Sequence, residues 1–195
     1  MKIHVTIFLL FFSCSVFADN ISDFQIEGIS VGDSLLNYFS EDEIKENTGY
    51  IYEEHGNKGK EIASFGTNKN LNKFDMVEFE FKTLNHMYEV ASIKAYIYFE
   101  ENIQECVKFQ KKIFNDLKNL FPNKEYFEDG PFSHPGYPNN DVIILKRIGF
   151  FLNINKRSNI DIICFDISEK FNKKDRLSLT IRSDEYNDWI FELYK

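Results

Sequence analysis

The pentapeptide at residues 28–32 is the first segment whose residue types could support catalysis. It reads Gly-Ile-Ser-Val-Gly and matches G-x-S-x-G, the elbow in which a strand-to-helix turn exposes the nucleophilic serine of α/β-hydrolases. The hydrolase sheet needs several strands before its elbow, and too few residues precede Ser30 to form them. We therefore expect a turn in which Gly28 and Gly32 supply backbone freedom. A small secreted hydrolase that uses Ser30 is the alternative.

Metal-ligand spacing is absent from the sequence. Beyond residue 18, the histidines at positions 55, 86 and 134 are never four residues apart and never accompany a cysteine pair, as zinc sites require. Acidic pairs such as Glu53-Glu54 lack the Asp/Asn alternation and the glycine of a calcium loop. We expect no metal, no cofactor and no catalytic residue.

The segment 128–141 (EDGPFSHPGYPNND) is the stretch that we single out as a possible binding surface. It holds three of the four prolines in the chain. Loops of this length are uncommon in compact domains and are often functional. Phe132, His134 and Tyr137 are the candidate contact residues, and a mobile loop without function is the alternative.

Residues 1–18 (MKIHVTIFLLFFSCSVFA) have the features of a secretory signal peptide. Lys2 supplies the positive start, an apolar stretch too short to span a membrane follows, and Val16-Phe17-Ala18 resembles a cleavage site. Cleavage there would make Asp19 the first residue of a periplasmic or secreted protein. The alternative is lipoprotein processing, in which Cys14 would be acylated and would become the N-terminus.

Two cysteines are predicted to form a disulfide bond. Removal of the signal peptide leaves Cys106 and Cys164 as an even pair in a chain that is bound for an oxidising compartment. Cys106 lies on the apolar face of a predicted helix, and Cys164 lies in an apolar strand. Packing of that helix on the sheet would bring the two together, as a bridge requires. Two separately buried thiols are the alternative.

Composition limits the partners of the protein. The net charge of −8 argues against nucleic acid as an electrostatic partner. After signal removal, no apolar run is long enough for a transmembrane segment. The length of 195 residues predicts one domain over residues 19–195. An unidentified ligand or an envelope protein is the expected partner.

Alternation and helical periodicity predict the main elements. Apolar residues alternate with polar ones in 77–81 and 93–99, which predicts an antiparallel hairpin. The helix at 102–121 has apolar residues at i, i+3, i+4 and i+7 and ends before Pro122. Further strands are expected at 22–30 (or an extended arm), 50–54, 61–65, 142–154 (long enough for two segments or for a bulge at Gly149), 160–167 and 177–181. Short helices are expected after Asp33 or Ser34 and after Ser40, and a C-terminal helix after Ser183 or Asp184.

These elements define an α+β fold. Strands that follow one another through short turns favour an antiparallel sheet over repeated βαβ units. We expect about five to seven strands, one long helix packed on a face of the sheet, short N-terminal helices and a C-terminal helix.

Three stretches together resemble a family of uncharacterised, predicted exported proteins of marine bacteria. They are FQIEGISVGDSLL at 24–36, IQEC at 103–106 and ICFDIS at 163–168, and the terminal EYNDW at 185–189 fits the same pattern. The resemblance implies a shared fold and a shared cysteine pair, and it implies no activity. The sequence therefore favours a non-enzymatic periplasmic or envelope-associated binding domain. A hydrolase and an envelope-assembly factor are the alternatives.

Overall fold

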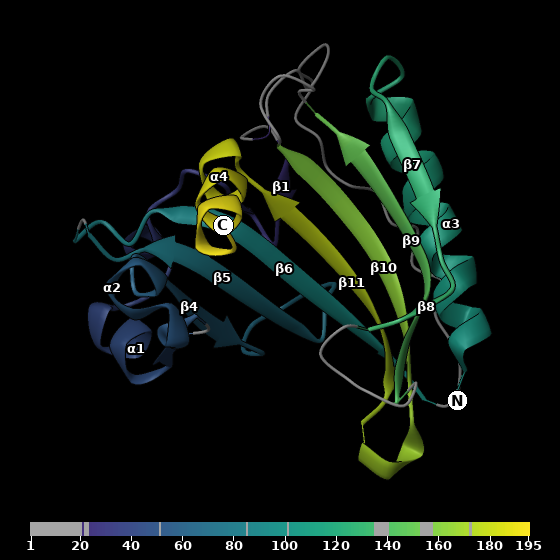
Figure 1. Cartoon of the computed structure of the whole chain (residues 1–195), viewed down its shortest axis with the longest axis horizontal. Coiled ribbons are helices and arrows are strands. Elements are labelled where there is room, and N and C mark those ends of the chain that lie inside the picture. The colour runs from purple at the N-terminus through teal and green to yellow at the C-terminus, as the bar shows by residue number, and fades with distance from the viewer. Residues whose placement is uncertain are drawn as a thin grey trace.

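A nine-stranded antiparallel sheet forms the centre of the protein. The computed structural model describes residues 21, 24–50, 52–84, 86–100, 102–134, 141–152, 158–171 and 173–195. The strands are β3 (Thr48–Gly49), β4 (Ile62–Thr67), β5 (Met76–Lys82), β6 (Val90–Phe99), β7 (Tyr126–Asp129), β8 (Phe132–Ser133), β9 (Val142–Phe151), β10 (Asn159–Ile167) and β11 (Asp175–Arg182). Their order is β3-β4-β5-β6-β11-β10-β9-β7, and β8 also pairs with β9. The strand direction turns progressively from β4 to β9 (Figure 1), as the twist of extended chains requires.

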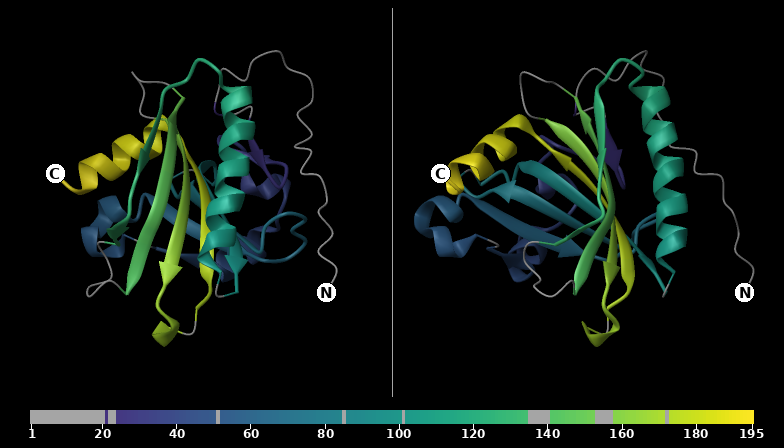
Figure 2. Two further views of the ribbon diagram at one scale, coloured as in Figure 1. Left: turned by 90° about the vertical axis from the view of Figure 1, so that its right-hand side faces the viewer. Right: turned by 45° about the vertical axis from the view of Figure 1, so that its right-hand side comes forward.

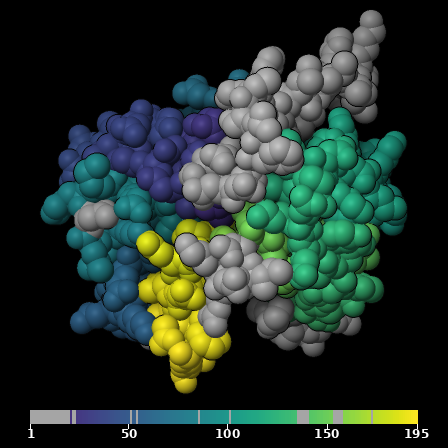
Figure 3. All heavy atoms as spheres, turned by 90° about the horizontal axis from the view of Figure 1, so that it is seen from above, coloured from purple at the N-terminus to yellow at the C-terminus, as the bar shows by residue number. Residues whose placement is uncertain are grey.

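Helices lie on both sides of this sheet. They are α1 (Glu41–Glu46), α2 (Gly56–Gly59), α3 (Ile103–Leu120) and α4 (Asp184–Leu193), with 3-10 turns η2 (Leu35–Asn37), η3 (Glu53–His55) and η5 (Glu169–Phe171). The strands stand between α3 and α4 (Figure 2). A separate hairpin, β1 (Gln25–Ile26) with β2 (Ile29–Ser30), precedes η2. Seen from above, α4 (yellow) and α3 (green) lie at different edges of the molecule (Figure 3).

The main core lies between the sheet and α3. Alternate residues of the strands supply its largest side chains, because successive residues of a strand point to opposite faces. The fully buried members include Phe65, Phe79, Ile93, Ile148, Phe150, Ile160 and Ile162. From α3, Cys106, Ile113 and Leu117 are buried against them. We call this side of the sheet the helix face.

The predicted long helix is confirmed within one residue at each end. Its cap is Asn102, whose side chain accepts a hydrogen bond from the Glu105 backbone N–H at 3.3 Å. The chain leaves the helix at Phe121, immediately before Pro122, because proline lacks the backbone donor that a further turn needs. Among the described residues, no helix is long and apolar enough to cross a membrane.

The α+β class and the antiparallel sheet are confirmed, whereas the expected strand number is too low. The sheet has nine strands rather than five to seven. β3 and β8 contain only two residues each, which is too short for an alternation of apolar residues. β7 comes from a segment with no clear alternation and is held by pairing with β9. Such strands exist because a neighbouring strand offers backbone hydrogen bonds.

Two further expectations are wrong in detail. The segment expected as a strand at 50–54 leads instead into η3 and α2. The irregularity of β9 lies at Leu145 rather than at Gly149, since Cys164 pairs with Lys146 and Phe165 with Ile144. Gly149 has another role. A Cβ there would come within 2.2 Å of the Phe127 ring, so only glycine allows that ring to lie on the strand.

Candidate functional site

The face of the sheet opposite α3 carries most of the buried polar side chains of the strands. Directly paired residues of antiparallel strands share a face, so the register arranges these side chains in rows. The rows are Glu80-Ser92-Arg182-Asn159, then Glu78-Lys94-Thr180-Asp161, then Tyr96-Ser178-Ile163-Arg147, and last Tyr98-Arg176-Phe165-Ile144-Phe132. We call this side the polar face. α4 packs on part of it through Tyr186, which is buried with Ile62 and Ala91.

Asp161 is the centre of a fully partnered cluster on the polar face. Its side chain is 1% exposed and accepts hydrogen bonds from Arg147, Arg182 and Asn159, with 3.2 Å from Arg147 Nη2 and 2.9 Å from Asn159 Nδ2. Burial alone would lower the pKa of Arg182, but the charge of Asp161, the hydrogen bond to it, and the nearby Tyr186 and Glu80 together raise that pKa. This cluster joins three strands, and its charges are satisfied within the protein.

Glu80 is equally buried and has no such partners. Its side chain is 1% exposed, and neither carboxylate oxygen has a hydrogen-bond partner in the part of the chain that the structure describes. The nearest cation is Lys94, whose Nζ lies 3.6 Å from Glu80 Oε1. The Tyr52 and Tyr186 hydroxyls are 3.3 Å apart, and burial together with the charge of Glu80 raises the pKa of Tyr186. A buried carboxylate without donors destabilises the fold.

Arg176 is held between two aromatic rings in the last row of the polar face. Its Cζ lies 5.1 Å from the ring centroid of Tyr96 and 5.1 Å from that of Phe165. Its Nε is buried without a hydrogen-bond partner. Among the described residues, no carboxylate lies within ion-pair distance of this guanidinium, although Arg147 and Arg182 both pair with Asp161.

His134 lies near Arg176, and Phe132 lies further along the same row, on β8. The His134 ring is 6.0 Å from the Phe165 ring. Burial, and then the positive charge of Arg176, lower the pKa of His134. Phe132 pairs with Ile144 in β8 and is 38% exposed. Of the three candidate residues of the 128–141 segment, His134 is therefore near the aromatic-bound arginine, Phe132 lies at the β8 end of the same row, and Tyr137 lies outside the described residues.

Ser30 occupies a buried position in the short N-terminal hairpin. It is 4% exposed, and its backbone N–H donates to Asp33 Oδ2 at 2.8 Å. The flanking Gly28 and Gly32 have φ of 85° and 93°, the left-handed conformation that glycine adopts without strain. A nucleophile elbow has to expose its serine, and Ser30 is not exposed.

The predicted disulfide is confirmed. Cys106 of α3 and Cys164 of β10 are joined with an S–S distance of 2.03 Å, and their Cα atoms are 6.0 Å apart. Both residues are completely buried. The bond connects α3 to β10, and its burial keeps external thiols from reaching it. Cys14 and the predicted cleavage site lie outside the described residues.

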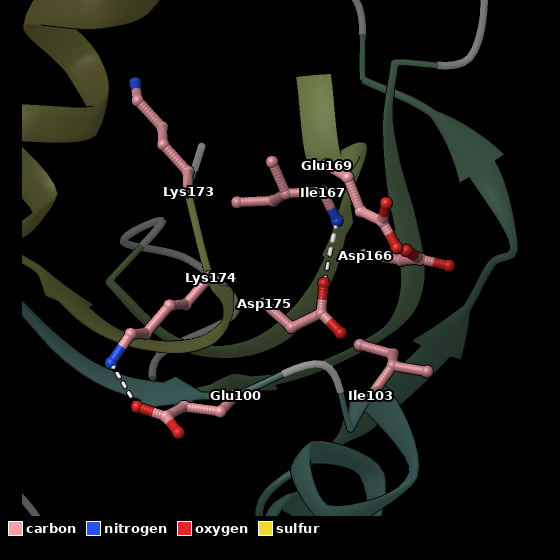
Figure 4. A pocket seen from close by; sticks show the side chains of 8 residues that line it. All are labelled: Glu100, Ile103, Asp166, Ile167, Glu169, Lys173, Lys174 and Asp175. Atoms are coloured by element: carbon pink, nitrogen blue, oxygen red, sulfur yellow. Dashed lines mark hydrogen bonds and ion pairs between the residues drawn. The ribbon is translucent and has the colours of Figure 1, made fainter. Parts of the chain in front are cut away.

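A hollow of about 800 Å³ lies where β6, β10 and β11 meet the start of α3 (Figure 4). Three of its six charged side chains have partners within it. Lys174 Nζ is 2.7 Å from Glu100 Oε1, and Asp175 Oδ1 accepts the Ile167 N–H at 2.9 Å. Burial and the charge of Asp175 raise the pKa of Asp166. In the described part of the chain, no group of three or more His, Cys, Asp or Glu residues could hold a metal ion.

Glu80 and Arg176 were not identified from the sequence. Each stands at a polar position of an alternating strand, where a solvent-exposed side chain is the usual expectation. Their burial depends on which side chains of neighbouring strands lie beside them, and no local pattern records that register.

Comparison of the chain with models of protein families, with curated proteins and with solved structures finds no match. The function is therefore argued from the geometry of the polar face.

Proposed function

We propose that this protein is an exported, non-enzymatic binding domain that takes its ligand on the polar face of its sheet. The observation that carries the proposal is that the Glu80 carboxylate and the Arg176 Nε are buried without a hydrogen-bond partner among the described residues, on a face where Asp161 is fully partnered.

Unmet hydrogen bonds of this kind reduce stability. A buried polar group that is left without a partner costs roughly 1–3 kcal/mol, and more when it is charged. Well-packed apolar side chains at the same positions would avoid that cost. A ligand that supplies the missing donors or acceptors would offset it, and ligand-binding sites are places where such groups are found.

The predicted compartment agrees with a binding role. Residues 1–18 have the features of a signal peptide, and disulfides persist in oxidising compartments such as the periplasm. The resemblance of residues 24–36 to exported proteins of marine bacteria points the same way. N-terminal sequencing of the protein purified from the cell should begin at Asp19. An acylated Cys14 as the first residue would instead place the protein on a membrane surface.

The alternative functions have less support. The burial of Ser30 does not favour a hydrolase that uses this serine as its nucleophile. An envelope-assembly factor would bind a protein rather than a small ligand, and stable co-purification of one envelope protein in stoichiometric amount would favour it.

Ligand-induced thermal stabilisation tests the proposal. The full chain, expressed with residues 1–18 in place and purified as the cell processes it, would be screened against sugars, amino acids, peptides, fatty acids and polyamines. A ligand that binds only the folded state raises the melting temperature. We expect the shift to be reduced in Glu80→Gln or Arg176→Gln and unchanged in Lys111→Gln on the exposed side of α3. Equal shifts in all variants would contradict binding at the polar face.

A further inference from the structure

We propose that Arg176 binds the carboxylate of a ligand whose apolar part extends across β10 and β9 to the exposed side chain of Phe132. This inference rests on the proposed binding function and names the class of ligand, an amphiphilic carboxylate. It depends on three features of the last row of the polar face: a guanidinium with a fixed plane, the lack of an anion among the described residues, and an exposed apolar side chain, Phe132, in the same row.

The two aromatic rings hold the guanidinium in place. Its Cζ is 5.1 Å from the centroids of both Tyr96 and Phe165, a distance at which a cation is attracted to an aromatic face. The Tyr96 hydroxyl is itself held by Glu78 Oε2 at 3.1 Å. A side chain that is already ordered loses little conformational entropy when a ligand binds.

The Arg176 guanidinium has no carboxylate partner among the described residues, and the carboxylate of a ligand could take that place. Arg147 and Arg182 already donate to Asp161. Arg176 has no carboxylate partner among the described residues, and its buried Nε donates to none of them. The planar fork of arginine donors matches the two oxygens of a carboxylate, which it binds through parallel hydrogen bonds.

The exposed ring of Phe132, at the β8 end of the same row, favours a carboxylate that carries an apolar part. Val142, Ile144, Phe165 and Ile167 form a small cluster that is separate from the main core. β8 places Phe132 beside Ile144, with 38% of Phe132 exposed. An alkyl chain or ring that covers Phe132 would remove this apolar area from water, which is favourable.

Matched probes separate the two parts of the site. Calorimetric titration would compare octanoate with acetate, octylamine and octanol at submicellar concentrations. Octanoate should bind, acetate should bind at least tenfold more weakly because it has no chain, and octylamine and octanol should show no measurable binding. Raising the salt concentration should weaken octanoate binding, since the interaction includes a charge pair.

Matched variants assign the site to its residues. Arg176→Gln should weaken octanoate binding at least tenfold, and Arg176→Lys should weaken it less, because lysine keeps the charge without the fork. Phe132→Ala, at a partly exposed position outside the cores, should weaken octanoate binding and leave acetate binding unchanged. Lys174→Gln removes a cation of the 800 Å³ hollow and should change nothing. Fluorescence of Trp189, the single tryptophan of the chain, reports whether each variant is folded.

Each outcome decides between the two proposals. Equal octanoate affinity in Arg176→Gln and the unmodified protein, or octylamine that binds as tightly as octanoate, would overturn the carboxylate site. If octanoate fails to bind but another ligand binds in a manner that depends on Glu80, this inference is wrong and the binding function stands. If nothing in the screen binds, both are overturned.

Discussion

At the scale of single residues, the effect of a buried charge on the stability of this protein depends on its hydrogen-bond partners. Asp161 and Glu80 are both 1% exposed carboxylates on central strands. Asp161 lies between two arginines that donate to it, whereas Glu80 has only Lys94 at 3.6 Å and accepts no hydrogen bond. The first carboxylate joins neighbouring strands, and the second reduces stability unless a ligand partners it.

Glu80→Gln should therefore make the unliganded protein more stable. The amide removes the buried charge, and Lys94 keeps Glu78, whose Oε2 is 3.8 Å from its Nζ. We expect a gain of about 1 kcal/mol in the free energy of unfolding, the lower part of the range for an unsatisfied buried group. Urea denaturation of the two proteins measures it. A loss of stability would mean that the attraction between Glu80 and Lys94 outweighs the desolvation of the carboxylate.

His134 should make stability depend on pH. Burial and the charge of Arg176 lower the pKa of His134 in the folded state. In the unfolded chain, its pKa is about 6.5. At lower pH the unfolded state takes up the proton first, so His134 reduces stability as the pH falls through and below about 6.5 and has no such effect above it.

Melting temperatures between pH 8 and pH 5 test this effect. The melting temperature of the unmodified protein, relative to that of His134→Gln, should fall as the solution is acidified. A difference that stays constant over this pH range would contradict the assignment.

At the scale of elements, the amphipathic helix α3 is attached to the sheet by several kinds of contact. Leu117 on its inner side is completely buried in the main core, and Lys111 is exposed. Cys106 on the same inner side is bonded to β10. Gln110, also buried, donates from Nε2 to the Ile162 carbonyl at 2.8 Å. α3 is therefore held by packing, by one covalent bond and by a buried hydrogen bond.

Alanine substitutions on the two sides of α3 should have very different effects. Leu117→Ala leaves a cavity in the core and should cost about 2–5 kcal/mol of unfolding free energy. Lys111→Ala removes only exposed atoms and should stay within about 0.5 kcal/mol. Denaturant unfolding curves of both variants give the comparison. Similar costs would mean that α3 packs through a different side.

At the scale of the whole molecule, the disulfide joins distant parts of the chain. Cys106 and Cys164 are separated by 58 positions in the sequence, and the loop between them includes β7, β8, β9 and part of β10. A covalent link of this span restricts the unfolded chain more than it restricts the folded one.

Removal of the disulfide should lower stability substantially. The chain-entropy model gives roughly 4 kcal/mol for a loop of this length. The double variant Cys106→Ala/Cys164→Ala, compared with the oxidised protein in urea, measures the loss. The oxidised protein should also show no alkylatable thiol before denaturation and reduction. Unfolding midpoints that coincide would show that the link has no stabilising role.

The sequence alone determined the features that repeat along a short stretch of chain. The 3.6-residue period of the apolar side chains located α3, and the two-residue alternation located β5 and most of β6. The disulfide followed from an even cysteine pair, an export signal and two apolar faces. Each of these inferences needed only neighbours along the chain or a count of residues, and the structure agrees with the helix, the hairpin and the bridge.

Only the tertiary structure decided the short strands and the polar face. β3, β7 and β8 exist because longer strands offer them backbone hydrogen bonds, and none has a periodicity of its own. Arg176 lies between Tyr96 of β6 and Phe165 of β10 because β11 pairs with both strands in one register. A shift of one residue would turn these side chains to the helix face. The register is set by the packing of the whole sheet against α3, and that packing joins residues that are far apart in the sequence.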